Sequence, residues 1–229
     1  MTTHLVTGAG AGIGECVARR LAARGDELVL VARSAARAEE LAGAFPVART
    51  VVADLADPHG LAPSLAGLLP ERLDSLIHVA GRVDLGPVAE QSAQVWRRTL
   101  DVNLLAPAEL TRLCLPSLRA ARGHVVFVNS GAGLRANPLW ASYAASKHGL
   151  RALADALRGE EREQGVRVTS VYPGRTATAM QEKVHEQEGK EYDPSDWVDP
   201  DSVATTVLMA LDLPRDAEVT DLRVNPGPR

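Results

Sequence analysis

The sequence predicts a doubly wound α/β fold, in which helices cover both faces of a parallel sheet of about seven strands. Short runs rich in valine, isoleucine and leucine alternate with segments of helical periodicity along the whole chain. Continuous apolar runs are typical of parallel strands that are buried on both faces. The length of 229 residues suits one large domain of this kind. We therefore expect residues 1–229 to form a single domain.

Seven apolar runs are the predicted strands, and helical patterns lie between them. The predicted strands are 4–7, 27–32, 49–53, 73–80, 123–129, 166–172 and 219–224. In the intervening segments apolar residues recur every three or four positions, which is the spacing of a helix with one buried face. The predicted helices are 12–24, 34–44, 58–69, 92–119, 141–164 and 200–211. Pro107 and Pro116 are expected to bend the fourth helix or end turns within it. Alternating strands and helices of this length predict a Rossmann-like sheet.

One segment departs from this alternation. Residues 180–198 are strongly charged and lie between the sixth strand and the last helix. Long polar insertions of this kind often act as lids over a site. We expect this segment to be a substrate flap.

Composition excludes several classes of function. The formal net charge is -4 with interspersed signs, whereas a nucleic-acid partner calls for a concentrated basic face. No run approaches the roughly 18 apolar residues of a membrane span, and no export signal precedes the first strand. The two cysteines, Cys16 and Cys114, are expected to be reduced thiols, and no metal-ligand spacing occurs. A cytoplasmic protein without a metal is predicted.

A glycine-rich turn directly follows the first predicted strand. The segment 7–14 reads TGAGAGIG, and a helical pattern begins at once. Glycine lets the backbone turn tightly and approach a diphosphate, while the helix amino terminus offers free N–H groups to the anion. The turn therefore predicts a dinucleotide site. The residues expected at the diphosphate are Gly8, Ala11, Gly12, Ile13 and Gly14.

The spacing of Gly8, Gly12 and Gly14 resembles the TGxxxGxG motif that opens the short-chain dehydrogenase/reductase family. Further motifs extend the resemblance over essentially the whole chain. It implies a nicotinamide cofactor and a carbonyl–alcohol oxidoreductase. The family's NNAG motif is only partly present, because residues 78–81 read HVAG. His78, on an apolar strand, is interpreted as a core histidine, while Ala80 and Gly81 let the cofactor pass.

The end of the second strand indicates which dinucleotide is bound. An acid at this point would accept from a ribose hydroxyl, but the chain has Arg33, whose guanidinium suits a 2′-phosphate. NADP(H) is therefore predicted, with NAD(H) as the alternative. Ala11 stands where NADP-preferring relatives often carry a basic residue. The resemblance also implies that Asp54 and Leu55 contact the adenine, and a turn-capping role for Asp54 is compatible with this.

Tyr143 and Lys147 carry the predicted chemistry. They are four residues apart on a predicted helix and therefore share a face. A tyrosine titrates near 10, so useful proton transfer near neutral pH requires a stabilised phenolate, and a neighbouring ammonium favours that form. Ser130, at the end of the fifth strand, is expected to hydrogen-bond the substrate oxygen. The resemblance gives Asn103 the role of interrupting its helix and holding a water linked to Lys147.

The segment after the sixth strand completes the predicted site. Residues 173–178 read PGRTAT and resemble the family's PGxxxT segment, which receives the nicotinamide carboxamide. Pro173, Gly174, Thr176 and Thr178 are the expected contacts. Arg175 is interpreted as a surface charge, with an anionic substrate as the alternative.

The sequence thus predicts an NADP(H)-dependent oxidoreductase acting on a small carbonyl or alcohol. One rival is a catalytically silent dinucleotide-binding sensor or regulatory protein, which would not need Ser130, Tyr143 and Lys147 together. Another is a scaffold subunit whose long helices serve oligomerisation. The family resemblance implies a homodimer or homotetramer, with helices 92–119 and 141–164 at the interface.

Overall fold

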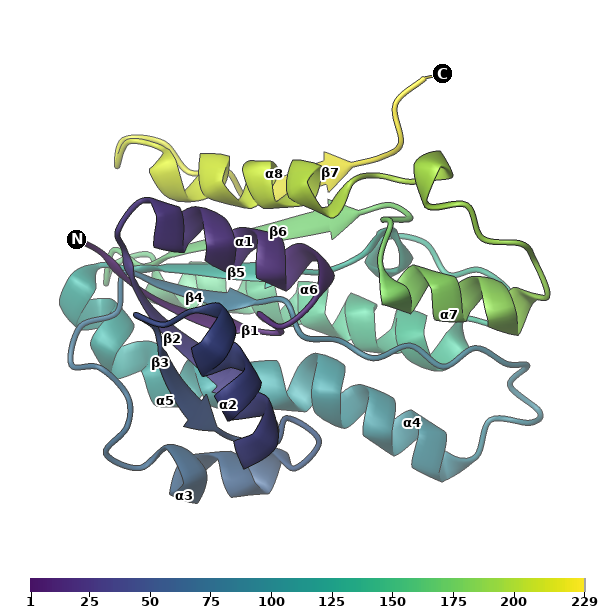
Figure 1. The fold of residues 1–229 in the computed structure, drawn as a ribbon, viewed down its shortest axis with the longest axis horizontal. Helices are drawn as coiled ribbons and strands as arrows, with labels where there is room; N and C mark the ends of the chain where they lie inside the picture. Colours follow the sequence, from purple (N-terminus) through teal and green to yellow (C-terminus); the bar gives the residue numbers. More distant parts are fainter. Residues whose placement is uncertain (229) are drawn as a thin grey trace.

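The computed structural model describes residues 1–228 and contains one seven-stranded sheet between two layers of helices (Figure 1). The strands are β1 (Thr3–Thr7), β2 (Glu27–Ala32), β3 (Arg49–Val52), β4 (Ser75–His78), β5 (His124–Val128), β6 (Arg167–Pro173) and β7 (Asp221–Val224). Their order is β3-β2-β1-β4-β5-β6-β7, and every neighbouring pair is parallel. The predicted fold class is confirmed.

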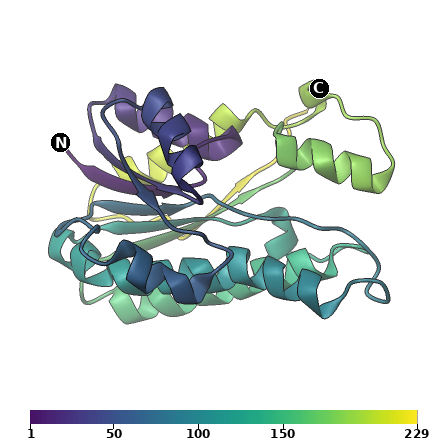
Figure 2. The same cartoon turned by 60° about the horizontal axis from the view of Figure 1, so that its bottom comes forward.

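Helices cover both faces of the sheet, as Figure 2 shows. The helices are α1 (Gly12–Ala23), α2 (Ala35–Ala44), α3 (Leu61–Leu65), α4 (Ala93–Leu100), α5 (Ala106–Ala121), α6 (Ala141–Glu161), α7 (Ala179–Glu188) and α8 (Pro200–Asp212). One face packs against α1, α2 and α8, and the other packs against α3, α5 and α6. The sequence of β-strand, helix and parallel β-strand produces this double layer.

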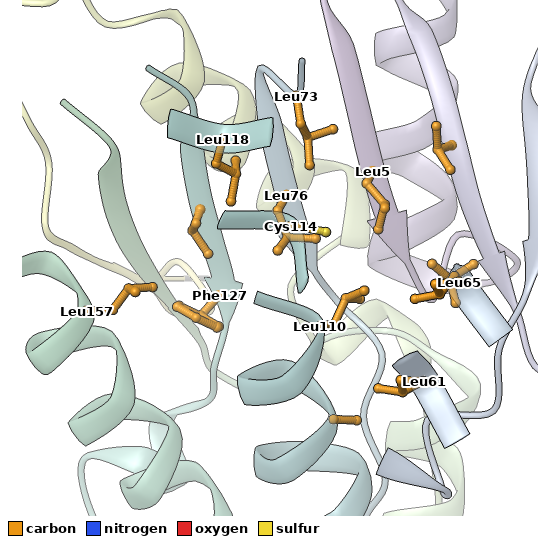
Figure 3. Close-up of a cluster of buried hydrophobic side chains, with 14 of the residues drawn as sticks. Leu5, Leu61, Leu65, Leu73, Leu76, Leu110, Cys114, Leu118, Phe127 and Leu157 are labelled. Atoms are coloured by element: carbon orange, nitrogen blue, oxygen red, sulfur yellow. The ribbon is translucent and has the colours of Figure 1, made fainter. Parts of the chain in front are cut away.

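The larger core lies between the sheet and the α5–α6 layer (Figure 3). Leu5 and Phe127 project from β1 and β5 and meet Leu110 from α5, while Leu157 comes from α6. All four are buried. Removing such a side chain costs about 2–5 kcal/mol, because the cavity adds to the lost apolar contact. This layer therefore fixes the position of α6 on the sheet.

The long helix predicted over 92–119 is a compound element. It runs as α4, then a π-helical turn (Asp101–Leu105), then α5. Pro107 lies in the first turn of α5 and Pro116 inside it. Pro107 thus lies just after the π turn, and Pro116 is accommodated within α5. The π turn places Asn103 inward, where it is 1% exposed.

The helix predicted over 58–69 is shorter than expected. It consists of a 3₁₀ turn (Pro58–Gly60) followed by α3. Ala66 leaves the helical region with a ψ of 122°, and Gly67 adopts a φ of +70°. A left-handed glycine directly after the last turn is a common helix stop.

Three further findings concern the described residues 1–228. None of their helices is long and apolar enough to cross a membrane. None of their His, Cys, Asp and Glu side chains gather in threes at a spacing that would hold a metal ion. Cys114 is a buried free thiol, whereas Cys16 is a free thiol that is only half-buried.

The topology determines where a site can form. The strand order reverses between β1 and β4, and connections from these two central strands run to opposite sides. Ligands of open α/β sheets bind outside the carboxyl ends of the strands at such a switch point. In Figure 1, α7 lies beyond the carboxyl ends of β6 and its neighbours. Most of α7 falls within residues 180–198, the segment predicted to be a flap.

Candidate active site

The glycine turn lies at the switch point and has no room for larger residues. Gly8 has a φ of +74°, and a Cβ on Gly8 would lie 2.8 Å from the Ala80 nitrogen. A Cβ on Gly14 would lie 2.1 Å from the Gly8 carbonyl oxygen. Helix α1 begins at Gly12, and its N-cap residue Ala11 offers no capping side chain. The first N–H groups of α1, with Ile13 among them, are therefore available to an anion.

Replacing Gly14 with alanine is expected to abolish tight dinucleotide binding and to lower the melting temperature. The new methyl group would collide with the Gly8 backbone, which cannot move as a side chain does. Calorimetric titration with NADPH measures the loss. Gly159→Ala is the matched control, because nothing lies within 4 Å of a Cβ there and alanine favours a helix by about 1 kcal/mol. Unchanged NADPH affinity in the Gly14 variant would contradict the assignment of the turn.

The adenosine end of the site carries two arginines. Arg33 is exposed at the end of β2, and it forms no ion pair with any of residues 1–228. The sequence reasoning did not identify Arg37, one helical turn further along. Its guanidinium donates to the Gly10 carbonyl at 2.7 Å and pairs with Glu40. No local pattern marked Arg37, because Arg33 precedes α2 and the contact of Arg37 is with the distant Gly10.

The other predicted adenine contacts lie at neighbouring strand ends. Asp54 follows β3 and is exposed. Its carboxylate accepts from the Ala56 N–H at 2.9 Å and so caps a turn. Leu55 packs against the larger core. Ala80 donates its N–H to the Thr7 hydroxyl at 3.2 Å, which ties the end of β4 to β1.

His78 belongs to the core. Its ring stacks on Phe127 with centroids 5.0 Å apart, and its Nε2 lies 3.0 Å from the Thr111 hydroxyl. Burial lowers the pKa of His78 to about 3, and the nearby Lys147 charge acts in the same direction. A histidine that is neutral over the whole physiological range and is held in the core is a structural residue.

Tyr143 and Lys147 lie on the buried face of α6, 6% and 3% exposed respectively. The Lys147 ammonium lies 5.9 Å from the centroid of the Tyr143 ring and donates to the Val128 carbonyl at 3.1 Å. It also lies 3.9 Å from the point that a Cβ on Gly81 would occupy. The predicted proton-handling pair is therefore brought together, beside the small residues at the end of β4.

The pKa values of this pair differ from the expectation. Burial raises the pKa of Tyr143 above its usual value, and a hydrogen bond with Ser130 acts weakly in the opposite direction. Burial lowers the pKa of Lys147 to about 8. The expected lowering of the Tyr143 pKa is thus absent, because the cost of removing the phenolate from water dominates. The phenol is protonated at neutral pH.

Ser130 and Asn103 adjoin this pair from two other elements. Ser130 follows β5, and its hydroxyl accepts from the Ala132 N–H at 3.1 Å while it hydrogen-bonds Tyr143. Asn103 accepts from the Arg82 N–H and donates to the Arg82 carbonyl, both at 2.8 Å, and it also donates to the Ser146 hydroxyl at 3.0 Å. Asn103 thus joins the loop after β4 to α6, on the turn that interrupts its helix. The predicted helix interruption is confirmed.

Asn129 is a second residue that the sequence reasoning left without a role. Its amide donates to the Lys147 carbonyl at 3.1 Å, and the residue is 4% exposed. Since Lys147 also donates to the carbonyl of Val128, two consecutive residues of one segment hold both ends of the lysine. Asn129 is therefore a positioning residue for Lys147.

The segment after β6 closes the site opposite the glycine turn. Pro173 ends β6, and Gly174 donates to the Val224 carbonyl at 2.7 Å. The hydroxyl of the buried Thr176 donates to the Gly174 carbonyl at 3.1 Å. Thr178 is the N-cap of α7, and a Cβ on Gly12 would lie 2.9 Å from its methyl group. The start of α7 therefore packs directly onto the glycine turn.

Comparison with known proteins agrees with this geometry. The family model for short chain dehydrogenase matches residues 2–189. The chain is 33% identical over 225 residues to dehydrogenase/reductase SDR family member 7B of Bos taurus, covering 90% of this chain and 69% of the relative. An alcohol dehydrogenase from Thermococcus sibiricus complexed with 5-hydroxy-NADP has a TM-score of 0.84 at 27% identity, covering 99% and 97% of the two chains. The closed form of serine dehydrogenase complexed with NADP+ has a TM-score of 0.86 at 26% identity, covering 98% and 95%. The chain belongs to the short-chain dehydrogenase/reductase family of oxidoreductases.

Proposed function

We propose that the protein is an NADP(H)-dependent oxidoreductase that interconverts a carbonyl and an alcohol. The observation that supports this most strongly is the convergence of Ser130, Tyr143 and Lys147 from β5 and α6 beside the glycine turn. A dinucleotide-binding sensor would need the turn but not this triad. Consumption of NADPH with a panel of ketones, aldehydes, sugars and acyl-thioesters tests the proposal. No turnover with any member, in the presence of tight NADPH binding, would favour the sensor.

Each residue of the proposed site has its own role in carbonyl reduction. When bound, NADPH supplies a hydride to the carbonyl carbon. The Ser130 hydroxyl donates a hydrogen bond to the carbonyl oxygen, and the Tyr143 hydroxyl donates its proton to that oxygen as negative charge develops. The Lys147 ammonium stabilises the phenolate that remains. Asn103 holds the loop after β4 against α6, where a water chain would return the proton to the pair.

The cofactor residues fit a dinucleotide with an additional phosphate. Arg33 has no carboxylate partner among residues 1–228, and Arg37 lies against the glycine turn, so two guanidinium groups flank the expected ribose. No acidic residue stands at the end of β2 to accept from a 2′-hydroxyl. Guanidinium groups bind phosphate oxygens in a bidentate manner. Two of the solved structures of similar fold are complexed with NADP+ or a modified NADP.

Replacing Arg33 with alanine is expected to weaken NADPH binding by about 10-fold to 100-fold, corresponding to the loss of about 1.5–3 kcal/mol from a charged hydrogen bond. NADH binding should change by less than about 2-fold. Titration of each cofactor by calorimetry or protein fluorescence gives both constants. Arg37→Ala should show the same preference with some loss of NADH as well, because Arg37 also supports the turn. Equal losses of NADPH and NADH in the Arg33 variant would refute the choice of NADP(H).

The remaining assignments are proposals of the same kind. We propose that residues 180–198 form a substrate flap, since α7 packs on the turn and on the loop after β4. We also propose a cytoplasmic homodimer or homotetramer, in which α4, α5 and α6 face a second copy. Light scattering during size-exclusion chromatography measures the mass, and a monomer would contradict the assembly.

A further inference from the structure

Apolar side chains from four segments pack around Tyr143. Val83 comes from the loop after β4, Ala132 from the turn after β5 and Val184 from α7, and all three pack with Tyr143. Leu85 and Trp140 complete this cluster. A carbonyl bonded to Ser130 and Tyr143 must place its substituents among these groups. We call these side chains the phenol wall.

The indole of Trp140 is the largest member of the phenol wall, and its position is fixed from several directions. It meets the Tyr143 ring edge-on, with centroids 5.7 Å apart. The Arg175 guanidinium lies 5.9 Å from its ring centroid. The preceding residue, Leu139, has a left-handed φ of +71°, and its carbonyl accepts from the Gly86 N–H at 2.9 Å. A strained leucine held in this way is a feature of sites that need one side chain in one place.

Several polar groups beside the phenol wall are already engaged. Lys183 donates to the Val83 carbonyl at 3.0 Å and pairs with Asp84 at 2.9 Å. Gln187 accepts from the Leu85 N–H at 3.1 Å. These bonds from α7 satisfy the loop after β4 and leave its apolar side chains directed at Tyr143. A polar substituent packed against these apolar side chains would lose its hydration, which is costly.

The cations at this edge are each held by a carboxylate. Asp84 binds Arg82 at 2.6 Å as well as Lys183. Arg175 pairs with Glu188 at 2.6 Å, and its guanidinium also lies 5.4 Å from the Trp197 ring centroid, so its charge is shared between a carboxylate and two indoles. Arg175, interpreted from the sequence as a surface charge or an anion contact, is partly buried in this ion pair. A substrate carboxylate would have to displace these ion pairs.

We infer that the substrate is a carbonyl, or the corresponding alcohol, that carries hydrocarbon substituents, and that Trp140 determines this specificity. The inference rests on the proposed function and names its substrate class. It separates this protein from the similar structure named serine dehydrogenase, whose name indicates a charged amino acid. Among residues 1–228, the cations beside the phenol wall, Arg82, Lys183 and Arg175, are already held by the carboxylates of Asp84 and Glu188. Arg135, exposed on the segment between Ser130 and Trp140, is the side chain that such a substrate would have to recruit.

The first test compares matched substrates with the wild-type protein and NADPH. Acetophenone, methyl 4-acetylbenzoate and 4-acetylbenzoate share one reacting group, and the ester separates the effect of size from that of charge. We expect kcat/KM to be at least 10-fold lower for the carboxylate than for its ester. A preference for the carboxylate, abolished by Arg135→Ala, would overturn the inference while leaving the proposed function intact. Absence of turnover with every carbonyl would instead overturn the proposed function, and the inference with it.

The second test uses variants of Trp140. Trp140→Ala should raise KM for acetophenone by about 10-fold to 100-fold with a smaller change in kcat, because the aryl group loses its wall. Trp140→Phe should restore most of the loss. The KM for acetone, which is too small to reach the indole, should be nearly unchanged, as should the Kd for NADPH. Equal effects on acetone and acetophenone would show that Trp140 only supports the fold, and would overturn its role in specificity.

Discussion

Replacing Tyr143 with phenylalanine is expected to lower kcat for carbonyl reduction by about 10²-fold to 10⁴-fold, which is the range of general acid catalysis. The phenol is buried and its hydroxyl is hydrogen-bonded to Ser130. The hydroxyl carries its proton at neutral pH, and the proton leaves as the Lys147 ammonium stabilises the phenolate that forms. Phenylalanine keeps the ring that packs on Trp140 and removes only the proton donor. The loss should therefore appear in the chemical step and not in folding.

Three measurements make this result specific. Single-turnover consumption of NADPH reports the chemical step, calorimetry reports the Kd for NADPH, and thermal unfolding reports stability. The Kd and the melting temperature should change little. Tyr172→Phe is the matched control, since Tyr172 is a buried tyrosine on β6 outside the proposed site. Turnover of the Tyr143 variant within a few-fold of the wild type would exclude the proton-donor role.

Most of the candidate site that could be predicted from the sequence was predicted from local motifs. The glycine turn, the four-residue spacing of Tyr143 and Lys147, and Ser130 at a strand end each combine residue type with position in a βαβ unit. These features depend on the backbone of one short segment, so the sequence is sufficient to place them. The central strands were likewise predictable, because they are rich in buried apolar residues, whereas β7 alternates apolar and charged residues.

What could not be predicted depends on contacts between distant segments. Arg37 reaches Gly10 across 27 residues, and Asn129 reaches the Lys147 carbonyl across 18. Neither contact leaves a periodic trace in the sequence. The direction of the Tyr143 pKa shift was also missed, because it depends on how completely the packed domain excludes water from the phenol. Motif spacing indicates that two groups meet, whereas their protonation depends on everything that surrounds them.

Replacing Lys147 with methionine is expected to raise stability at pH 7 while lowering turnover by about 10²-fold or more. Burial lowers the pKa of Lys147 from 10.5 to about 8 in the folded protein. Below pH 8 both the folded and the unfolded chains carry the charge, and the folded state bears the full cost of burying it. Between pH 8 and 10.5 the unfolded chain binds more protons than the folded one, so wild-type stability rises with pH. Methionine fits a buried site without a charge.

The size of the gain follows from the two pKa values. A pKa difference of about 2.5 units corresponds to about 3 kcal/mol, which the variant gains because it buries no charge. The variant also loses the hydrogen bond to the Val128 carbonyl, which lowers this gain by about 1 kcal/mol. A net gain of about 2 kcal/mol should raise the melting temperature by several degrees. Lys190→Met is the control, since Lys190 is exposed and its replacement should change stability by less than about 0.5 kcal/mol.

The stability advantage of the Lys147 variant over the wild type should shrink as pH rises from 8 toward 10.5. A variant that is less stable at pH 7, by an amount that does not vary with pH, would show that the ammonium is not desolvated. A lysine that is retained at this cost in stability is explained by what it contributes to the phenolate beside it.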